Sequence, residues 1–171
     1  ALPLALPILP IPALIRYQAA LHQSPSTEER TQVGPLSQHD ADMFGWKELT
    51  AMVARARDHL TPEERLHARV FGQNYGEAGA IDVLGRAYNL PPAISGHNSY
   101  WMWGPRGWDG AVLIIIGGDP EDNAKWFRSV EVVGTVDSPY AMPYERGIQV
   151  SIGRGLKMPV AEAWPLLKNF I

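Results

Sequence analysis

The fold of this chain is decided by a short apolar run, Ala68-Arg69-Val70-Phe71, and by the segment behind it, Gln73-Asn74-Tyr75-Gly76-Glu77-Ala78-Gly79-Ala80. A β-branched and aromatic run that breaks into a glycine-rich turn and then into an Ala/Ile/Leu pattern predicts a strand, a tight junction and a helix. In an open α/β sheet, ligands bind at such junctions. The segment therefore predicts both an α/β fold and the position of a ligand site.

The rest of the chain continues the alternation of helix and strand patterns. Apolar residues at three- and four-residue spacing predict an amphipathic helix from about Ala41 to Leu60. Further strands are expected at 93–95, 111–116, 130–136 and 148–152, and further helices at 77–88, 120–128 and 160–170, the last bent or restarted at Pro165. The run 111–116 has no polar alternation, so we expect it to be the central strand with both faces covered. Together the patterns predict a three-layer α/β/α sandwich with a mostly parallel, Rossmann-like sheet of about five strands.

Length and composition favour one globular core. The chain has 171 residues, of which 46% are hydrophobic. Its formal charge of −3 and the absence of a Lys/Arg block are unlike a nucleic-acid binder, so no nucleic-acid partner is expected. It contains no cysteine, which excludes disulfides, thiol catalysis and cysteine-based metal sites.

The first residues form a distinct, proline-rich segment. Prolines at positions 3, 7, 10 and 12 interrupt the apolar tract, and repeated proline is incompatible with a membrane-spanning helix, which needs about 20 apolar residues. The tract has no basic n-region and no initiator Met, so it looks like a piece cut from a larger protein rather than a signal peptide. We interpret residues 1–35 as a juxtamembrane arm that packs on a single α/β domain, 36–171. An extended soluble arm docked in a groove of the core is the alternative.

Three strand-to-helix junctions, at 74–79, 95–98 and 117–119, are expected to meet at one edge of the sheet. Polar and aromatic side chains gather there and form the candidate ligand site: Asn74, Tyr75, Glu77, Ser95, His97, Asn98, Tyr100, Trp101 and Asp119. His97 and Asn98 could hydrogen-bond a polyhydroxylated ligand while aromatic rings cover its apolar face. Two structural explanations stay open. One is that Glu77 caps its helix, and the other is that the tryptophan-rich loop serves packing or docks another domain.

Other kinds of site find little support in the sequence. The glycines after the first strand do not match the dinucleotide fingerprint, and no Gly-Lys-Ser/Thr follows any strand. His39, Asp40 and Asp42 lie close together, but no His-x₃-His or comparable ligand set exists, so a solvated helix start is expected and no metal. Ser95 and His97 are too close in sequence to form a catalytic pair without a special turn, and Gly-x-Ser-x-Gly is absent. We expect no cofactor.

Three segments carry a resemblance to a known family: Phe44-Gly45-Trp46, 73–82 and 90–105. They look like the soluble C-terminal region of bacterial membrane glycosyltransferases that are similar to the dolichyl-phosphate-mannose–protein mannosyltransferases, glycosyltransferase family 39. The resemblance covers most of the chain up to Val160. It implies a parent protein with many transmembrane helices that transfers a sugar from a polyprenyl-phosphate-linked donor to an acceptor outside the cytoplasm.

The resemblance also implies where catalysis lies. In such enzymes the catalytic carboxylate is on an extracytoplasmic loop of the membrane portion, and this sequence has no spanning segment. We therefore expect no catalytic residue here and interpret the chain as an extracytoplasmic domain that recognises or positions an acceptor. Its expected partners are the membrane-embedded portion of the same polypeptide and a glycan or lipid-linked sugar acceptor. The alternatives are a structural docking domain without a ligand, a small-molecule-binding α/β module, and a free-standing enzyme with a Glu77/His97 pair.

Overall fold

The computed structural model describes residues 6, 8–27 and 32–170, which divide into two compact units. The first unit comprises the described residues up to Gly45 together with Ser138–Arg146, and the second comprises Trp46–Asp137 and the residues from Gly147 onward. No helix among the described residues is long and apolar enough to cross a membrane. The boundary expected between residues 35 and 36, and the packing of the arm on the domain, stay predictions.

The first unit is small and mainly helical. It contains α2 (Ile11–Ala20), α3 (Gln38–Ala41) and the short 3₁₀ helix η2 (Pro143–Glu145). Pro12 lies in the first turn of α2, where a missing backbone N–H costs no helical hydrogen bond. The unit has its own apolar cluster, centred on Leu14, Leu36, Ala41 and Met142.

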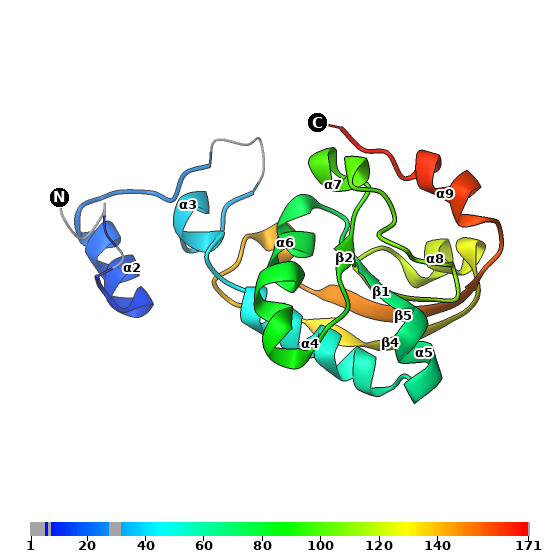
Figure 1. The fold of residues 1–171 in the computed structure, drawn as a ribbon. Coiled ribbons are helices and arrows are strands. Elements are labelled where there is room, and N and C mark those ends of the chain that lie inside the picture. The colour runs from blue at the N-terminus through cyan, green and yellow to red at the C-terminus, as the bar shows by residue number, and fades with distance from the viewer. Residues whose placement is uncertain (1–5, 7, 28–31, 171) are drawn as a thin grey trace. The chain divides into compact units, whose positions relative to one another are not determined.

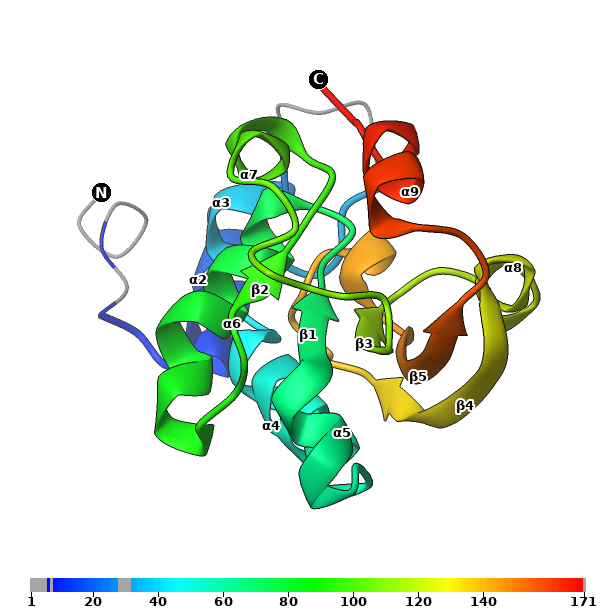
Figure 2. The same ribbon diagram turned by 45° about the vertical axis from the view of Figure 1, so that its right-hand side comes forward.

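The second unit contains one five-stranded sheet, formed by β1 (Ala68–Phe71), β2 (Ala93–Ile94), β3 (Val112–Ile116), β4 (Phe127–Val136) and β5 (Ile148–Leu156). The strand order is β2-β1-β3-β5-β4 (Figure 2). β1 pairs in parallel with β2 and β3, whereas β5 is antiparallel to both of its neighbours, β3 and β4. The α/β class is confirmed, and the sheet is mixed.

The prediction of a mostly parallel, Rossmann-like sheet is therefore wrong. The reason lies in the connection between β4 and β5, residues 137–147, whose only helix is the three-residue η2. A parallel pair needs a crossover of a dozen or more residues that usually contains an α-helix, whereas an antiparallel pair can be joined by a short loop. The short connection returns the chain beside β4 in the opposite direction, and β5 thereby enters the sheet between β3 and β4.

The helices of the second unit follow the predicted order with several changes. They are α4 (Trp46–Asp58), α5 (Pro62–His67), α6 (Tyr75–Leu84) with the 3₁₀ turn η1 (Gly85–Tyr88), α7 (Asn98–Met102), α8 (Pro120–Trp126) and α9 (Val160–Leu166). A short helix, α7, forms where an aromatic loop is predicted. α8 ends at Trp126, two residues earlier than expected, and Phe127 begins β4 three residues earlier than expected. α9 ends at Leu166, one residue after Pro165, and Asn169 forms a β-bridge with His97 instead of extending the helix.

The sheet has an apolar cluster on each face. Val112, Ile114 and Ile116 of β3 belong to a cluster with residues of α4 and α6, whereas Leu113 and Ile115 belong to a second cluster with residues from β4 and α9. β3 is buried along its whole length, as its unbroken apolar run predicts. Figures 1 and 2 show α4 and α6 on one side of the sheet, with α8 and α9 on the other. The second side is covered by two helices of seven residues each, which makes room for a pocket there.

Candidate functional site

The first predicted site residues lie at the start of α6 and stabilise that helix. Asn74 Oδ1 accepts a hydrogen bond from the Glu77 backbone N–H at 2.9 Å, which caps the helix. Glu77 Oε2 in turn accepts from the Gln73 backbone N–H at 2.6 Å, and only 6% of Glu77 is exposed. The structural explanation considered for Glu77 therefore has a direct physical basis. Ligand binding by Asn74 and Glu77 stays a prediction.

The second junction meets the first one, as parallel pairing of β1 and β2 requires. His97 is buried, its ring lies 5.0 Å from the Tyr75 ring, and its Nδ1 accepts from the Tyr75 backbone N–H at 3.3 Å. The other ring nitrogen, Nε2, lies 3.1 Å from the side-chain amide of Asn98. Ser95 Oγ accepts from the His97 backbone N–H at 3.1 Å. These contacts use both ring nitrogens of His97 inside the protein.

Of the remaining predicted residues, Tyr100 and Trp101 join elements to one another, and Asp119 caps a helix. The Tyr100 hydroxyl donates to Asp82 Oδ2 at 3.1 Å, and burial, helped by the Asp82 carboxylate, raises the pKa of Tyr100 to about 12. Trp101 Nε1 donates to the Trp164 carbonyl oxygen, and Trp164 Nε1 donates to the Trp101 carbonyl oxygen, each at 3.2 Å. Asp119 is exposed and caps α8 by accepting from the Glu121 backbone N–H at 2.7 Å. The aromatic segment therefore ties α7 to α6 and α9.

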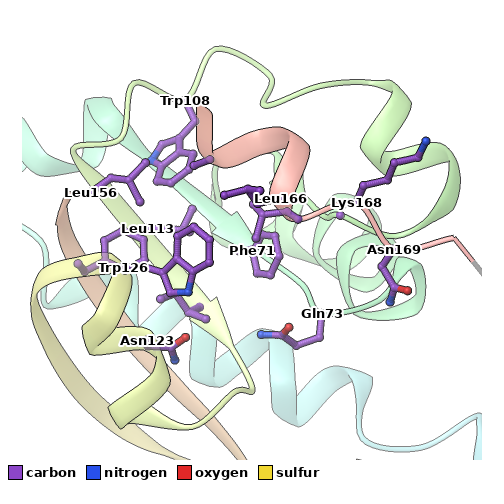
Figure 3. Close-up of a pocket in the computed structure, with 15 residues that line it drawn as sticks. Phe71, Gln73, Trp108, Leu113, Asn123, Trp126, Leu156, Leu166, Lys168 and Asn169 are labelled. Atoms are coloured by element: carbon purple, nitrogen blue, oxygen red, sulfur yellow. The ribbon is translucent and has the colours of Figure 1, made fainter. Parts of the chain in front are cut away.

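A pocket of about 370 Å³ lies beside this edge, on the face of the sheet opposite α4 and α6. Its aromatic walls are Phe71, Trp108 and Trp126, which Figure 3 labels, and Phe127. Leu113 and Ile115 of β3, with leucines from β5 and α9, complete the apolar surface. Its polar lining comes from four other side chains: Gln73, Asn123, Lys168 and Asn169. Small-molecule sites occupy roughly 300–1,000 Å³ and combine apolar walls with a few polar groups, so this pocket has the properties of one.

Two glycines allow the walls of the pocket to form. A Cβ on Gly153 of β5 would lie 2.7 Å from the Phe127 ring, so only glycine lets that ring pack on the sheet. A Cβ on Gly96 would lie 1.8 Å from the Leu167 carbonyl oxygen. The C-terminal segment instead approaches closely, with the Asn169 N–H donating to the Gly96 carbonyl at 2.8 Å. Gly96 thus brings residues 167–169 to the pocket as a wall.

The polar end of the pocket contains amide groups. Gln73 Nε2 donates to the Ile116 carbonyl oxygen at 3.1 Å, which links the ends of β1 and β3. The Asn123 side-chain nitrogen is buried and has no hydrogen-bond partner among the described residues. Figure 3 shows the Gln73 amide pointing toward the side of the pocket on which Asn123 lies. A polar atom buried without a partner is uncommon in native proteins and calls for a water, an ion or a ligand.

Sequence reasoning found the edge of the sheet and missed the pocket. It selected Trp101, whose indole is engaged with α9, and left out Trp126, Gln73 and Asn123. The available signal was the pair Trp126-Phe127, which is strongly apolar and sits where the expected helix gives way to a strand. That signal does not show on which face of the sheet the two rings pack. The neighbours of β4 depend on β5, which enters the sheet between β3 and β4.

The chain matches no protein-family model, no curated protein and no solved structure. Within the part of the chain that the structure describes, no group of three or more His, Asp or Glu side chains is placed to hold a metal ion. The geometry of the pocket is therefore the main physical guide to what this chain binds.

Proposed function

We propose that this chain is the extracytoplasmic domain of a polyprenyl-phosphate-sugar-dependent membrane glycosyltransferase and that it recognises or positions a glycan or acceptor. It would lie on the periplasmic or outer face of the cell membrane and act together with the membrane-embedded portion of the same polypeptide. The observation that carries the recognition role is the pocket of about 370 Å³ with aromatic walls and an amide end. The resemblance of segments 73–82 and 90–105 supports the identity of the parent.

Recognition fits the pocket better than catalysis does. General acid–base catalysis needs a titratable group within hydrogen-bond reach of the reacting atoms. The described lining contains no carboxylate and no histidine. The candidate pair for a free-standing enzyme, Glu77 and His97, is buried in contacts that hold α6 and the second junction. Sugar transfer itself would then belong to the membrane portion of the parent.

The first test of this proposal is the complete open reading frame. Several apolar segments upstream of Ala1, each long enough to span a membrane, are expected if the parent is a membrane glycosyltransferase. A reading frame without such segments would overturn this assignment.

The second test fills the pocket in the full-length protein. Leu166 lines the pocket and is 66% exposed, so Leu166→Trp should occupy pocket volume without disturbing the core. We expect this variant to raise the KM for acceptor in a transfer assay and to change kcat less. Leu66→Trp is the matched control, because Leu66 is 78% exposed on α5 and does not line the pocket. Equal transfer kinetics in the two variants would contradict a recognition role for the pocket.

A purely structural docking role is the second candidate, and exposed apolar side chains favour it. Met102 and Trp103 at the end of α7 are 71% and 59% exposed, and Phe170 is 52% exposed. Trp103→Ala would then prevent assembly of the full-length protein while the isolated chain stays folded. Normal assembly of Trp103→Ala, together with impaired transfer in Leu166→Trp, would favour recognition over docking.

A further inference from the structure

We propose that the pocket binds one uncharged pyranose sugar ring, with an apolar face of the ring on Trp126 and its hydroxyls on the side-chain amides of Gln73 and Asn123. This inference rests on the proposed function and narrows it. A glycan, a lipid head group and a polyprenyl phosphate are all conceivable ligands of such a domain, and the chemistry of the lining selects the neutral sugar.

The apolar part of the pocket suits the faces of a sugar ring. A pyranose presents C–H groups on its faces and hydroxyls around its edge. Trp126 is half-buried and lines the pocket with its indole, and Phe71 supplies apolar surface from the sheet (Figure 3). Ile115 adds to that surface. Aromatic side chains combine a large flat apolar surface with little conformational entropy to lose, which favours contact with a rigid ring.

The polar end of the pocket offers both donors and acceptors of hydrogen bonds. The Asn123 amide nitrogen is buried without a partner among the described residues. The side-chain amides of Asn123 and Gln73 both lie next to Gly118. A Cβ built on Gly118 would be 3.3 Å from each of them. Each amide offers a donor and an acceptor, as a ring of hydroxyls requires.

The charge of the lining argues against an anionic ligand. Lys168 is the only charged side chain in the described lining. Its ammonium lies 4.8 Å from the centre of the Trp101 ring and 4.7 Å from that of the Phe170 ring, and Figure 3 shows it directed away from Trp126. A phosphate or carboxylate at the amide end of the pocket would lose its hydration without gaining a charged partner there. The pocket volume lies near the lower end of the range for small-molecule sites, which suits a ligand of one ring.

An NMR titration of the chain with matched ring compounds tests the inference. The probes are methyl glycosides of glucose, mannose and galactose, with cyclohexanol as a ring that lacks the set of hydroxyls and glucuronate as a charged sugar. At millimolar concentration, at least one methyl glycoside should shift the Trp126 indole N–H and the Gln73 side-chain amide. Cyclohexanol and glucuronate should bind more weakly. Binding of either one at least as tightly as every glycoside, or no binding of any glycoside, would overturn the inference.

Variants separate a ligand contact from a structural role. Asn123→Leu keeps the size of the side chain and removes an unpartnered buried donor, so the stability of the chain should not fall. Its affinity for the best glycoside should fall about tenfold, as expected when a hydrogen-bond pair is lost. Unchanged affinity would count against the proposal. If Asn123→Leu does not fold, Gln73→Leu replaces it, with the exposed Gln23→Leu as control.

A matched pair of variants tests the aromatic wall of the pocket. Trp126→Ala should abolish measurable glycoside binding, whereas Trp103→Ala, which removes an exposed tryptophan outside the pocket, should leave it unchanged. Equal effects of the two variants would contradict stacking on Trp126. If no glycoside binds but Leu166→Trp still impairs transfer, the neutral-sugar inference fails and the proposed function stands. If glycosides bind but the reading frame lacks spanning segments, the neutral-sugar inference stands and the proposed function fails.

Discussion

Gly96 occupies a position where a side chain has no room. A Cβ there would meet the Leu167 carbonyl oxygen at 1.8 Å, so Gly96→Ala must push the C-terminal segment away from the sheet. We expect a loss of about 2–4 kcal/mol in the free energy of unfolding, together with loss of glycoside binding because a wall of the pocket moves. Denaturant unfolding and the NMR titration measure the two effects.

Gly79→Ala is the control for Gly96→Ala. Gly79 lies inside α6, and the nearest atom to a Cβ there is the Tyr100 hydroxyl at 3.9 Å. Alanine at this position should stabilise the helix by up to about 1 kcal/mol. A Gly96→Ala protein as stable as Gly79→Ala would show that residues 167–169 do not need this close approach.

Tyr100 makes the stability of the second unit sensitive to alkaline pH. Burial, with the Asp82 carboxylate beside it, raises the pKa of its hydroxyl from 10.0 to about 12. The folded state therefore holds this proton more tightly than the unfolded state. The resulting contribution is complete below pH 10 and is lost as the pH rises from about 10 towards 12, by at most about 3 kcal/mol.

Tyr100→Phe should remove this part of the alkaline loss. The variant also loses the hydrogen bond to Asp82, so its stability at neutral pH should be about 1 kcal/mol lower. Asp82 keeps its contact with Arg106 at 2.6 Å in either protein. The measurement is the free energy of unfolding against pH, and parallel alkaline curves for the two proteins would refute the role given to Tyr100.

At the scale of elements, Arg154 joins α5 to the antiparallel edge of the sheet. Its Nε lies 2.6 Å from Glu64 Oε1 at the start of α5, and another guanidinium nitrogen lies 2.8 Å from Glu131 Oε2 on β4. The pKa of Glu64 is lowered, first by the Thr61 backbone N–H and then by Arg154. The pKa of Glu131 is lowered, first by His59 and then by Arg154. Both carboxylates therefore stabilise the fold above their ordinary pKa, and the contribution disappears as the pH falls.

Arg154→Met should weaken this link and flatten the acid limb of the stability curve. We expect a loss of about 1–2 kcal/mol near neutral pH, because the pair is partly buried, and a smaller difference from the wild type in acid. The exposed Arg55→Met on α4 is the control. A loss in Arg154→Met that is the same at neutral and acid pH would mean that packing of the side chain, and not its charge, holds α5.

At the scale of the whole molecule, the apolar core of the first unit and the lining of the pocket consist of residues from different units. Leu36 is fully buried in the cluster of the first unit, whereas every described residue of the pocket lining belongs to the second. Leu36→Ala should therefore cost about 2–5 kcal/mol of local stability and leave glycoside affinity unchanged. Hydrogen exchange resolved by residue measures the first effect, and the NMR titration measures the second. A weakened affinity would mean that the pocket depends on the first unit.

Much of the fold was open to prediction because burial leaves a pattern in the sequence. The unbroken apolar run of β3 predicted a strand buried on both faces, and the helices expected from residues 77 and 120 begin at Tyr75 and Pro120 as α6 and α8. The meeting of the first two junctions followed from parallel pairing, and the contact between His97 and Tyr75 confirms it. Part of the sheet direction was also within reach, since no long helix separates the last two strand patterns. That short connection predicts antiparallel pairing.

The sequence by itself determined the order of the strands and of the longer helices, because apolar periodicity is a local property. Only the tertiary structure decided the antiparallel insertion of β5 and the pocket that results from it. A pocket is the space left uncovered when elements pack, and that space depends on contacts among residues far apart in the chain, such as Gly96 with Leu167 and Gly153 with Phe127. Local patterns record that a side chain is buried, but not which distant side chain lies against it.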